Sequence, residues 1–243
     1  MEKYWKSSYG IVCGLISISA SCSTSFAAMT FGGWNFNGVL GTSAPSIGKG
    51  TASTIGGVSA NFSAGDPADD QATVPAENKG WNLASFASQG TASGERGAVF
   101  QCSTVGYESA VVTWHERHSN SASRFVQFQY AIDGSTFTSE GIANGGIFEA
   151  TLGGDVWQTE RRVDLGSIQG VAGNGKFAVR IVSIFAPNTS AYAPTSLTAN
   201  YSPSGTVRFD LVTFEGVAVP APAALALGIA GAAAVGMGSR RRD

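Results

Sequence analysis

The sequence predicts an all-β protein, an antiparallel β-sandwich of jelly-roll-like form, followed by one C-terminal transmembrane helix. Strand-like runs recur at fairly regular spacing between turn residues, and no segment before the tail repeats its apolar residues with the helical period of 3.6. The composition agrees, with 32 glycines in 243 residues and 13% charged residues, against about 25% in a typical globular domain. The 43% of hydrophobic residues still allows a buried core, and the absence of an internal repeat argues against a β-propeller.

The first 27 residues have the order of a secretory signal peptide. Lys3 and Lys6 precede an apolar stretch over residues 11–20, and small residues follow as far as Ala27. We expect cleavage between Ala27 and Ala28. The alternative is a membrane anchor, but the apolar run is short and rich in serine, so it is poorly suited to spanning a bilayer. The sequence therefore predicts an exported protein.

The last residues have the order of a membrane anchor. Residues 216–239 carry no charge, and three arginines follow them directly. A helix over residues 223–238 would be about 24 Å long, against a hydrocarbon core of about 30 Å, which predicts a weak anchor with its arginines in the cytoplasm. The alternative is an alanine-rich soluble helix or tail. The chain thus divides into a signal (1–27), a β-sandwich domain (28–216) and an anchor segment (217–243).

The tail resembles the PEP-CTERM sorting signal, which combines a proline-containing motif, a short apolar helix and a terminal arginine cluster. The matching positions are Val219, Pro220, Pro222, Arg240, Arg241 and Arg242. Ala221 stands where the family usually has glutamate. The resemblance implies a sorting protease of exosortase type as partner. It also implies transient anchoring in the inner membrane, with release to the cell surface or extracellular matrix.

Strand signals run through the body of the chain. We expect strands at residues 30–37, 98–102, 109–117, 124–132, 176–185 and 206–215, and mostly loop with short strands over 44–82. In the fourth run, alternation places Val126, Phe128, Tyr130 and Ile132 on one face, and Asp133-Gly134 predicts a hairpin turn into Phe137. In the last run, alternation places Val207, Phe209 and Leu211 inward.

The body resembles a domain that often accompanies PEP-CTERM tails. The resemblance rests on "RFVQFQYAIDGSTFT" over residues 124–138, and on a tryptophan followed by "VDLGSIQGV", "FAVRIVSIF" and "RFDLVTFEG" over residues 157–216. It implies a jelly-roll β-sandwich of surface or secreted bacterial proteins, with no established activity.

Cysteine and histidine offer little chemistry. After signal removal only Cys102 remains, which excludes an intramolecular disulfide, and its alternation with Ala98 and Phe100 predicts a buried thiol. The only histidines, His115 and His118, lie three residues apart in a predicted strand, so their side chains should point to opposite faces and form no shared metal site. Their scarcity also argues against Ser-His-Asp catalysis. We therefore expect a protein that is not an enzyme.

Acidic residues suggest two further sites. Glycosidase chemistry needs two facing carboxylates, and the candidates near one another in sequence are Glu149, Asp155, Glu160 and Asp164. Calcium would find hard oxygen ligands in the loop containing Asp66, Asp69 and Asp70, and at Asp210, which interrupts an apolar strand. Carbohydrate-binding jelly rolls of similar appearance hold a structural calcium with an acid on the last strand. The alternative for the loop is a solvated acidic turn, and no other cofactor is expected.

The leading functional hypothesis is an exported cell-surface or matrix protein with a structural or adhesive role. The alternative is a carbohydrate-binding module that acts on exopolysaccharide, and an extracellular hydrolase ranks third. Trp34, Trp81 and Trp157 lie near turns and are the candidate sugar contacts, although core packing is favoured for each, while Trp114 is expected in the core. The net charge of −2 provides no basic surface for nucleic acid.

Overall fold

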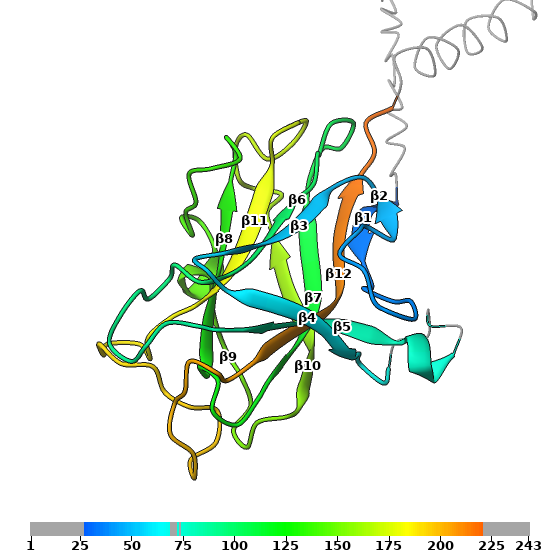
Figure 1. Cartoon of the computed structure of the whole chain (residues 1–243). Helices are drawn as coiled ribbons and strands as arrows, with labels where there is room; N and C mark the ends of the chain where they lie inside the picture. The colour runs from blue at the N-terminus through cyan, green and yellow to red at the C-terminus, as the bar shows by residue number, and fades with distance from the viewer. Residues whose placement is uncertain (1–26, 69–71, 73, 221–243) are drawn as a thin grey trace, which may run out of the picture.

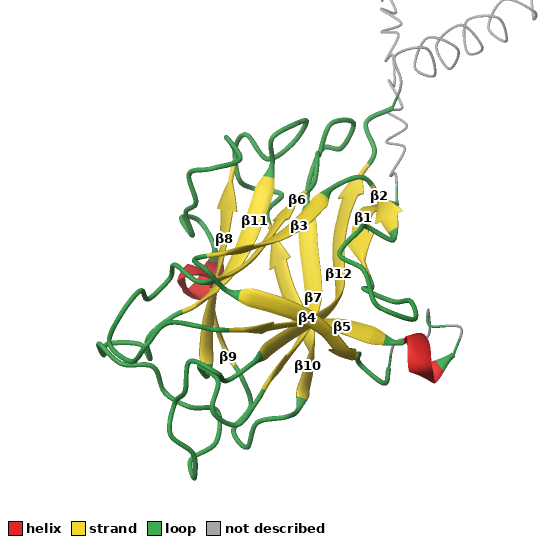
Figure 2. Ribbon diagram, viewed as in Figure 1, coloured by secondary structure: helices red, strands yellow, loops and turns green. Residues whose placement is uncertain are grey.

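The computed structural model describes residues 27–68, 72 and 74–220. The predicted signal before Ala27, Asp69, Asp70, and the tail from Ala221 to the terminal arginines lie outside this part. The described chain is all-β, with two short 3₁₀ turns, η1 (Pro75–Glu77) and η2 (Ala143–Gly146), shown in red in Figure 2. In the portion covered by the description, none of the helical segments is long and apolar enough to cross a membrane.

Twelve strands form two antiparallel sheets (Figure 1). The seven-stranded sheet contains β1 (Ala28–Trp34), β2 (Ile47–Gly48), β4 (Ser59–Ala64), β5 (Lys79–Ala84), β7 (Val111–His118), β10 (Trp157–Asp164) and β12 (Val207–Val217). The five-stranded sheet contains β3 (Thr51–Ile55), β6 (Gly97–Gln101), β8 (Phe125–Ala131), β9 (Ile147–Glu149) and β11 (Ala178–Ser183), in the order β3-β6-β11-β8-β9.

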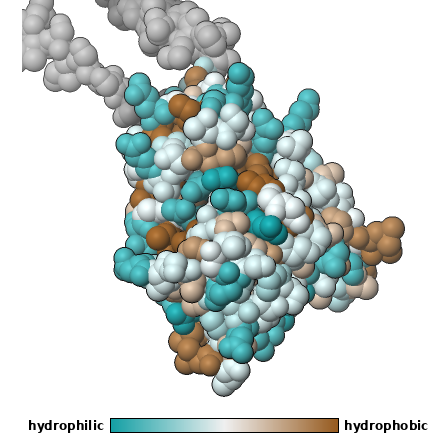
Figure 3. Space-filling view, turned by 60° about the vertical axis from the view of Figure 1, so that its left-hand side comes forward, coloured by the Kyte–Doolittle hydropathy of each residue, from teal (hydrophilic) through white to brown (hydrophobic). Residues whose placement is uncertain are grey.

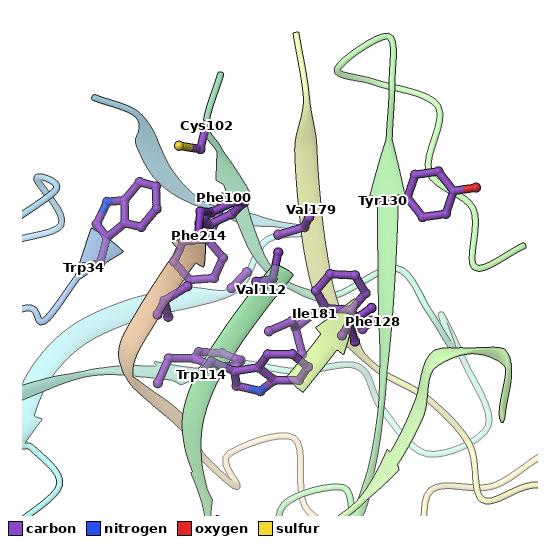
Figure 4. Close-up of a cluster of buried hydrophobic side chains, with 14 of the residues drawn as sticks. Trp34, Phe100, Cys102, Val112, Trp114, Phe128, Tyr130, Val179, Ile181 and Phe214 are labelled. Carbon is purple, nitrogen blue, oxygen red and sulfur yellow. The ribbon is translucent and has the colours of Figure 1, made fainter. Parts of the chain in front are cut away.

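One hydrophobic core fills the space between the sheets, which makes the architecture a β-sandwich (Figure 4). Aromatic side chains dominate it. Trp114 of β7 stacks on Phe128 of β8, with ring centroids 5.3 Å apart, and Phe214 of β12 packs edge-on against Trp34 of β1. The alternation predicted for β6, β7 and β8 is confirmed, because their inward residues are the buried ones. Ile132 is an exception, since β8 ends at Ala131 and Ile132 is exposed.

Strand β12 is the axis of the seven-stranded sheet and is broken by a bulge. It pairs with β7 along one side, and along the other side first with β5 and then with β1. The β7 register shifts between Asp210 and Thr213, and Leu211 has a φ of 44°. The prediction that Leu211 faces inward is therefore wrong. The extra residue resets the alternation, so that Val212 enters the core in its place.

Two further predictions are confirmed in outline. Residues 44–82 are mostly loop with short strands, as expected, and β3, β4 and β5 give this region a strand in each sheet, with β4 and β5 paired along six residues. The predicted turn at Asp133-Gly134 is confirmed, since Asp133 accepts hydrogen bonds from the Ser135 and Thr136 backbone and Tyr130 pairs with Thr138 across it. The hairpin closes through a single bridge, with no second strand.

The described chain ends lie side by side. Ala28 at the start of β1 pairs with Val217 at the end of β12, and both ends leave the same edge of the sandwich in Figure 1. The segments predicted to be signal and anchor are therefore attached at one end of the seven-stranded sheet.

Candidate binding site on the outer face of the seven-stranded sheet

A line of polar side chains crosses the outer face of the seven-stranded sheet, on the side away from the core. Strand register places five residues directly opposite one another: Trp157 of β10, Arg117 of β7, Arg208 of β12, Asn82 of β5 and Asn61 of β4. Directly opposed residues of antiparallel strands share a face. The neighbouring positions Glu116, Phe209 and Trp81 are buried on the inner face, so this line, which we name the outer row, lies on the outer face. Asn82 is itself 8% exposed, so the other four members are the ones open to solvent.

Side-chain hydrogen bonds join three members of the outer row. Arg208 donates from Nε to Asn82 Oδ1 at 3.2 Å and from Nη1 to the carbonyl oxygen of Ala64 at 2.6 Å. Asn82 in turn donates to Asn61 Oδ1 at 3.1 Å. These contacts fix the planar groups of three neighbouring strands in one orientation. Planar amides and guanidinium groups held in this way are suited to recognising hydroxyl and carboxylate oxygens.

Trp157 stands at the β10 end of the outer row and is partly exposed. It lines a hollow of about 340 Å³ together with Gln158, Thr159 and Arg161. The register of β10 shifts between Gln158 and Arg161, and this bulge opens the edge of the sheet beside the indole. The hollow is lined mainly by polar atoms, with an amide, a hydroxyl and a guanidinium group beside one partly exposed aromatic ring, a mixture suited to the hydroxyl rim of a sugar ring.

A buried carboxylate fixes Arg161. Glu116 is fully buried on the inner face of β7, and its Oε1 accepts from Arg161 Nε at 2.9 Å while Oε2 accepts from Trp114 Nε1 at 2.9 Å. Arg161 also donates to the Glu149 carbonyl at 2.7 Å and lies 5.2 Å from the centroid of the Phe148 ring. Arg161 therefore closes the edge between the two sheets and forms a rigid wall of the hollow.

His118 completes the buried network around Glu116. Its Nδ1 lies 2.7 Å from the Ser123 carbonyl oxygen, so this nitrogen carries a hydrogen, and its Nε2 lies 3.4 Å from Glu116 Oε1 without hydrogen-bond geometry. Burial alone would raise the pKa of the Glu116 carboxyl, but His118, the charge of Arg161 and the Trp114 hydrogen bond outweigh it, so the pKa is lowered. Glu116 is thus held as a carboxylate.

The calcium candidates Asp66 and Asp210 do come together, beside the outer row. Asp210 Oδ2 accepts from the Asp66 backbone N–H at 2.7 Å, and Asp66 Oδ2 lies 2.7 Å from His115 Nδ1. The remaining oxygens, Asp210 Oδ1 and Asp66 Oδ1, accept backbone hydrogens from Leu211 and Ala68. All four carboxylate oxygens therefore face nitrogen, as in a hydrogen-bonded anchor for the loop between β4 and β5. Calcium takes six to eight oxygen ligands, and of the four candidate acids only these two belong to the described residues.

Two further observations concern this loop. Within the described stretches, no three histidine, cysteine, aspartate or glutamate side chains gather as metal ligands. A hollow of about 420 Å³ borders the loop, lined by Ala64, Gly65, Pro67, Ala72, Pro75 and Asn78. Among its described lining residues the only planar polar side chain is Asn78, and residues 69–71 and 73 of the same loop lie outside the described part. Asp69 and Asp70, the other calcium candidates, lie outside the described residues.

Two of the three candidate sugar contacts are buried. Trp34 and Trp81 are 1% and 4% exposed and pack against Phe100, so the core packing favoured for them is confirmed and they are no longer candidates for sugar contact. Trp114 lies in the core as expected. The reason is that β1 and β5, which carry Trp34 and Trp81, pair within the sheet, and alternation turns both rings inward. Only Trp157 keeps the role of a candidate contact.

The candidate glycosidase acids are separated by individual arginine partners. Asp155 pairs with Arg117 at 2.8 Å, Glu149 with Arg124 at 3.3 Å and Asp164 with Arg162 at 3.9 Å. The side chain of Glu160 lies outside the description. The described carboxylates therefore act as ordinary ion-pair partners at the surface.

The predicted burial of Cys102 and the predicted divergence of the two histidines are confirmed. Cys102 is buried and free, and burial raises the pKa of its thiol to about 11. His115 faces outward to Asp66 whereas His118 lies in the core, so the two imidazoles point to opposite faces of β7.

The surface carries no broad apolar patch on the face shown in Figure 3, where hydrophobic groups form small separated areas among hydrophilic ones. The most exposed large apolar side chains are Leu40, Leu197 and Val39. Val39 and Leu40 are neighbours in the chain, and Leu197 lies in a separate loop. Single exposed apolar residues are common on folded proteins.

No family model matches the chain, and no curated protein matches it in sequence. Among solved structures, the CBM22-1 xylan-binding domain of Paenibacillus barcinonensis Xyn10C aligns with a TM-score of 0.41 and 10% identity, covering 81% of this chain and 100% of that domain. A Bacteroides thetaiotaomicron protein provisionally described as sugar-binding aligns with a TM-score of 0.38 and 11% identity, covering 77% and 95%. At this level of similarity the two alignments say nothing of what this chain binds.

Proposed function

We propose that the chain is a non-catalytic carbohydrate-binding protein whose site is the Trp157 hollow at the end of the outer row. The observation that carries the proposal is the position of Trp157. Three other tryptophans are buried, whereas Trp157 is partly exposed and lines the hollow with Gln158, Thr159 and Arg161. An indole combined with planar hydrogen-bonding groups suits a pyranose, which has an apolar face and polar edges.

Affinity electrophoresis of the full chain in gels containing xylan, β-glucan, alginate or polygalacturonate tests this proposal. The wild type should be retarded by at least one polymer. Trp157→Ala should lose about tenfold or more in affinity, because stacking on a partly buried aromatic ring contributes on the order of 1–2 kcal/mol. Trp157→Phe should recover part of the binding.

Val105→Ala is the matched control, since Val105 is an exposed apolar residue of the loop between β6 and β7, where the Gly106 carbonyl accepts from Val219 beyond the far end of β12. It should bind like the wild type. Equal retardation of the wild type and Trp157→Ala would contradict the proposal, and so would the absence of retardation by every polymer.

The proposal includes export and sorting. We infer that residues 1–27 direct secretion and that the PEP-CTERM-like tail, with an apolar helix, holds the protein transiently at the inner membrane before release to the cell surface or matrix. A jelly-roll-like order of strands belongs to the same proposal, and the repeated crossing of the chain between the two sheets supports it. Binding to exopolysaccharide would give such a protein an adhesive role.

Mass spectrometry of the exported protein tests the export proposal. The mature N-terminus should be Ala28, an exposed residue at the start of β1. A protein that retains Met1 would contradict it.

A further inference from the structure

Two arginines in the middle of the outer row add positive charge to the site. Arg117 and Arg208 lie directly opposite each other on β7 and β12, between Trp157 and the two asparagines. The row crosses five strands, so its length is four strand spacings, or about 19 Å. An extended chain lying across the strands from Trp157 would therefore pass over both guanidinium groups.

The charges of the two arginines are unequally compensated. Arg117 donates from Nε to the Asp155 carbonyl and pairs with its carboxylate at 2.8 Å. Arg208 hydrogen-bonds to the neutral oxygens of Asn82 and Ala64, and the described part of the chain places no carboxylate within ion-pair distance of it. Burial and the charge of Arg117 lower the pKa of Arg208, while Asp155 and Asp210 act against this shift. Two neighbouring guanidinium groups thus share one surface carboxylate.

Among the described side chains, two further acids lie beside the outer row, and both are buried. Asp210 is opposite His115, on the next pair of positions of β12 and β7 along this face, and Asp66 follows β4. They are 0% and 2% exposed, their oxygens accept from N–H groups or contact His115, and the charge of Asp210 acts on Arg208 from within the fold. Asp155, in contrast, is 47% exposed at its side chain, so it competes with a ligand for Arg117 from the solvent side. Of the two partly exposed guanidinium groups, only Arg117 has a described carboxylate within ion-pair distance, so Arg208 is the group that a ligand carboxylate could pair with directly.

We propose that the ligand of the outer row is an acidic polysaccharide built of uronic acid residues, with its carboxylates at Arg117 and Arg208 and a sugar ring on Trp157. This inference rests on the proposed function of the same site and names its substrate class. A planar guanidinium group can bind a carboxylate through two parallel hydrogen bonds. Neutral sugars have no carboxylate and cannot form this pair. Charge attraction should also make the binding sensitive to salt.

Isothermal titration of the full chain with polygalacturonate oligomers and with uncharged xylan oligomers tests this inference. The wild type should bind the acidic oligomer about tenfold or more tightly than the neutral oligomer, because one charge-assisted hydrogen bond typically changes an affinity by about that factor. Arg117→Gln and Arg208→Gln should each reduce the affinity for the acidic oligomer by about tenfold and leave the affinity for the neutral one nearly unchanged. The preference should shrink as salt rises.

Arg162→Gln is the matched control, because Arg162 is on the same strand as Trp157 but pairs with the exposed Asp164 outside the outer row. Arg208 also holds the Ala64 carbonyl, so thermal unfolding of each variant should be recorded, and Arg117 at the rim provides the second test if Arg208→Gln unfolds. Equal affinity for both oligomers with Trp157-dependent binding would overturn the acidic preference and leave the proposed function standing. Binding of neither oligomer would overturn both.

Discussion

At the scale of single residues, Glu116 connects the core to the binding site. A carboxylate with no exposed surface is costly unless it is paired, and here Arg161, Trp114 and His118 surround it. The same Arg161 forms a wall of the Trp157 hollow. Removing the carboxylate would therefore leave a partly buried guanidinium without its counter-charge and would loosen the hollow.

Glu116→Gln should lower the free energy of unfolding at pH 7 by about 3 kcal/mol, the usual cost of breaking a buried ion pair. The pKa of Glu116 is lower in the folded than in the unfolded state, so its stabilisation is complete above the unfolded pKa of about 4.3 and is lost as pH falls through the folded value. Urea unfolding at pH 7 and pH 3 should thus show that the free energy of unfolding falls less on acidification in Glu116→Gln than in the wild type.

Glu149→Gln is the comparison for that measurement, because Glu149 is 55% exposed and pairs with Arg124 at the surface. It should change stability little at either pH. If the free energy of unfolding depended on pH identically in the wild type and in Glu116→Gln, Glu116 would not be a source of that pH dependence.

At the scale of elements, alternation in the sequence predicts the strands that are regular. Phe100, Trp114 and Phe128 are buried as expected, because β6, β7 and β8 keep their period of two without interruption. Leu211 is different. It follows the inward pattern of Phe209, but β12 changes its neighbour from β5 to β1 at this point, and the bulge that accommodates the change is a tertiary effect.

The candidate site could be predicted only in part, because the pairing of distant strands, and not the local sequence, brings its residues together. Trp157 is visible in the sequence as a tryptophan near a turn. Its neighbours Arg117, Arg208 and Asn82 come from strands far apart along the chain, and only the register of the assembled sheet aligns them. No local pattern marks these residues, since arginine and asparagine on an outward strand position look like ordinary solvated surface.

At the scale of the whole molecule, the site and the chain ends lie toward opposite ends of β12. Ala28 and Val217 pair at its C-terminal end, whereas Arg208 is near its beginning, nine residues or roughly 30 Å away along the strand. A protein held at a membrane by the predicted tail would therefore present the outer row away from its attachment point. This arrangement suits a surface protein that binds a polysaccharide while it is anchored or after it is released.

The central claim is that Trp157 contacts the glycan, and an NMR titration of the ¹⁵N-labelled chain tests it most directly. The ligand is an oligosaccharide made from the polymer that binds best in affinity electrophoresis, and Trp157→Phe assigns the indole resonance. We predict that the Trp157 indole signal shifts with saturation, while those of Trp34 and Trp114, which donate to Ser43 and Glu116 within the fold, stay in place. A saturable shift confined to the five-stranded sheet, with the Trp157 indole unmoved, would contradict the claim.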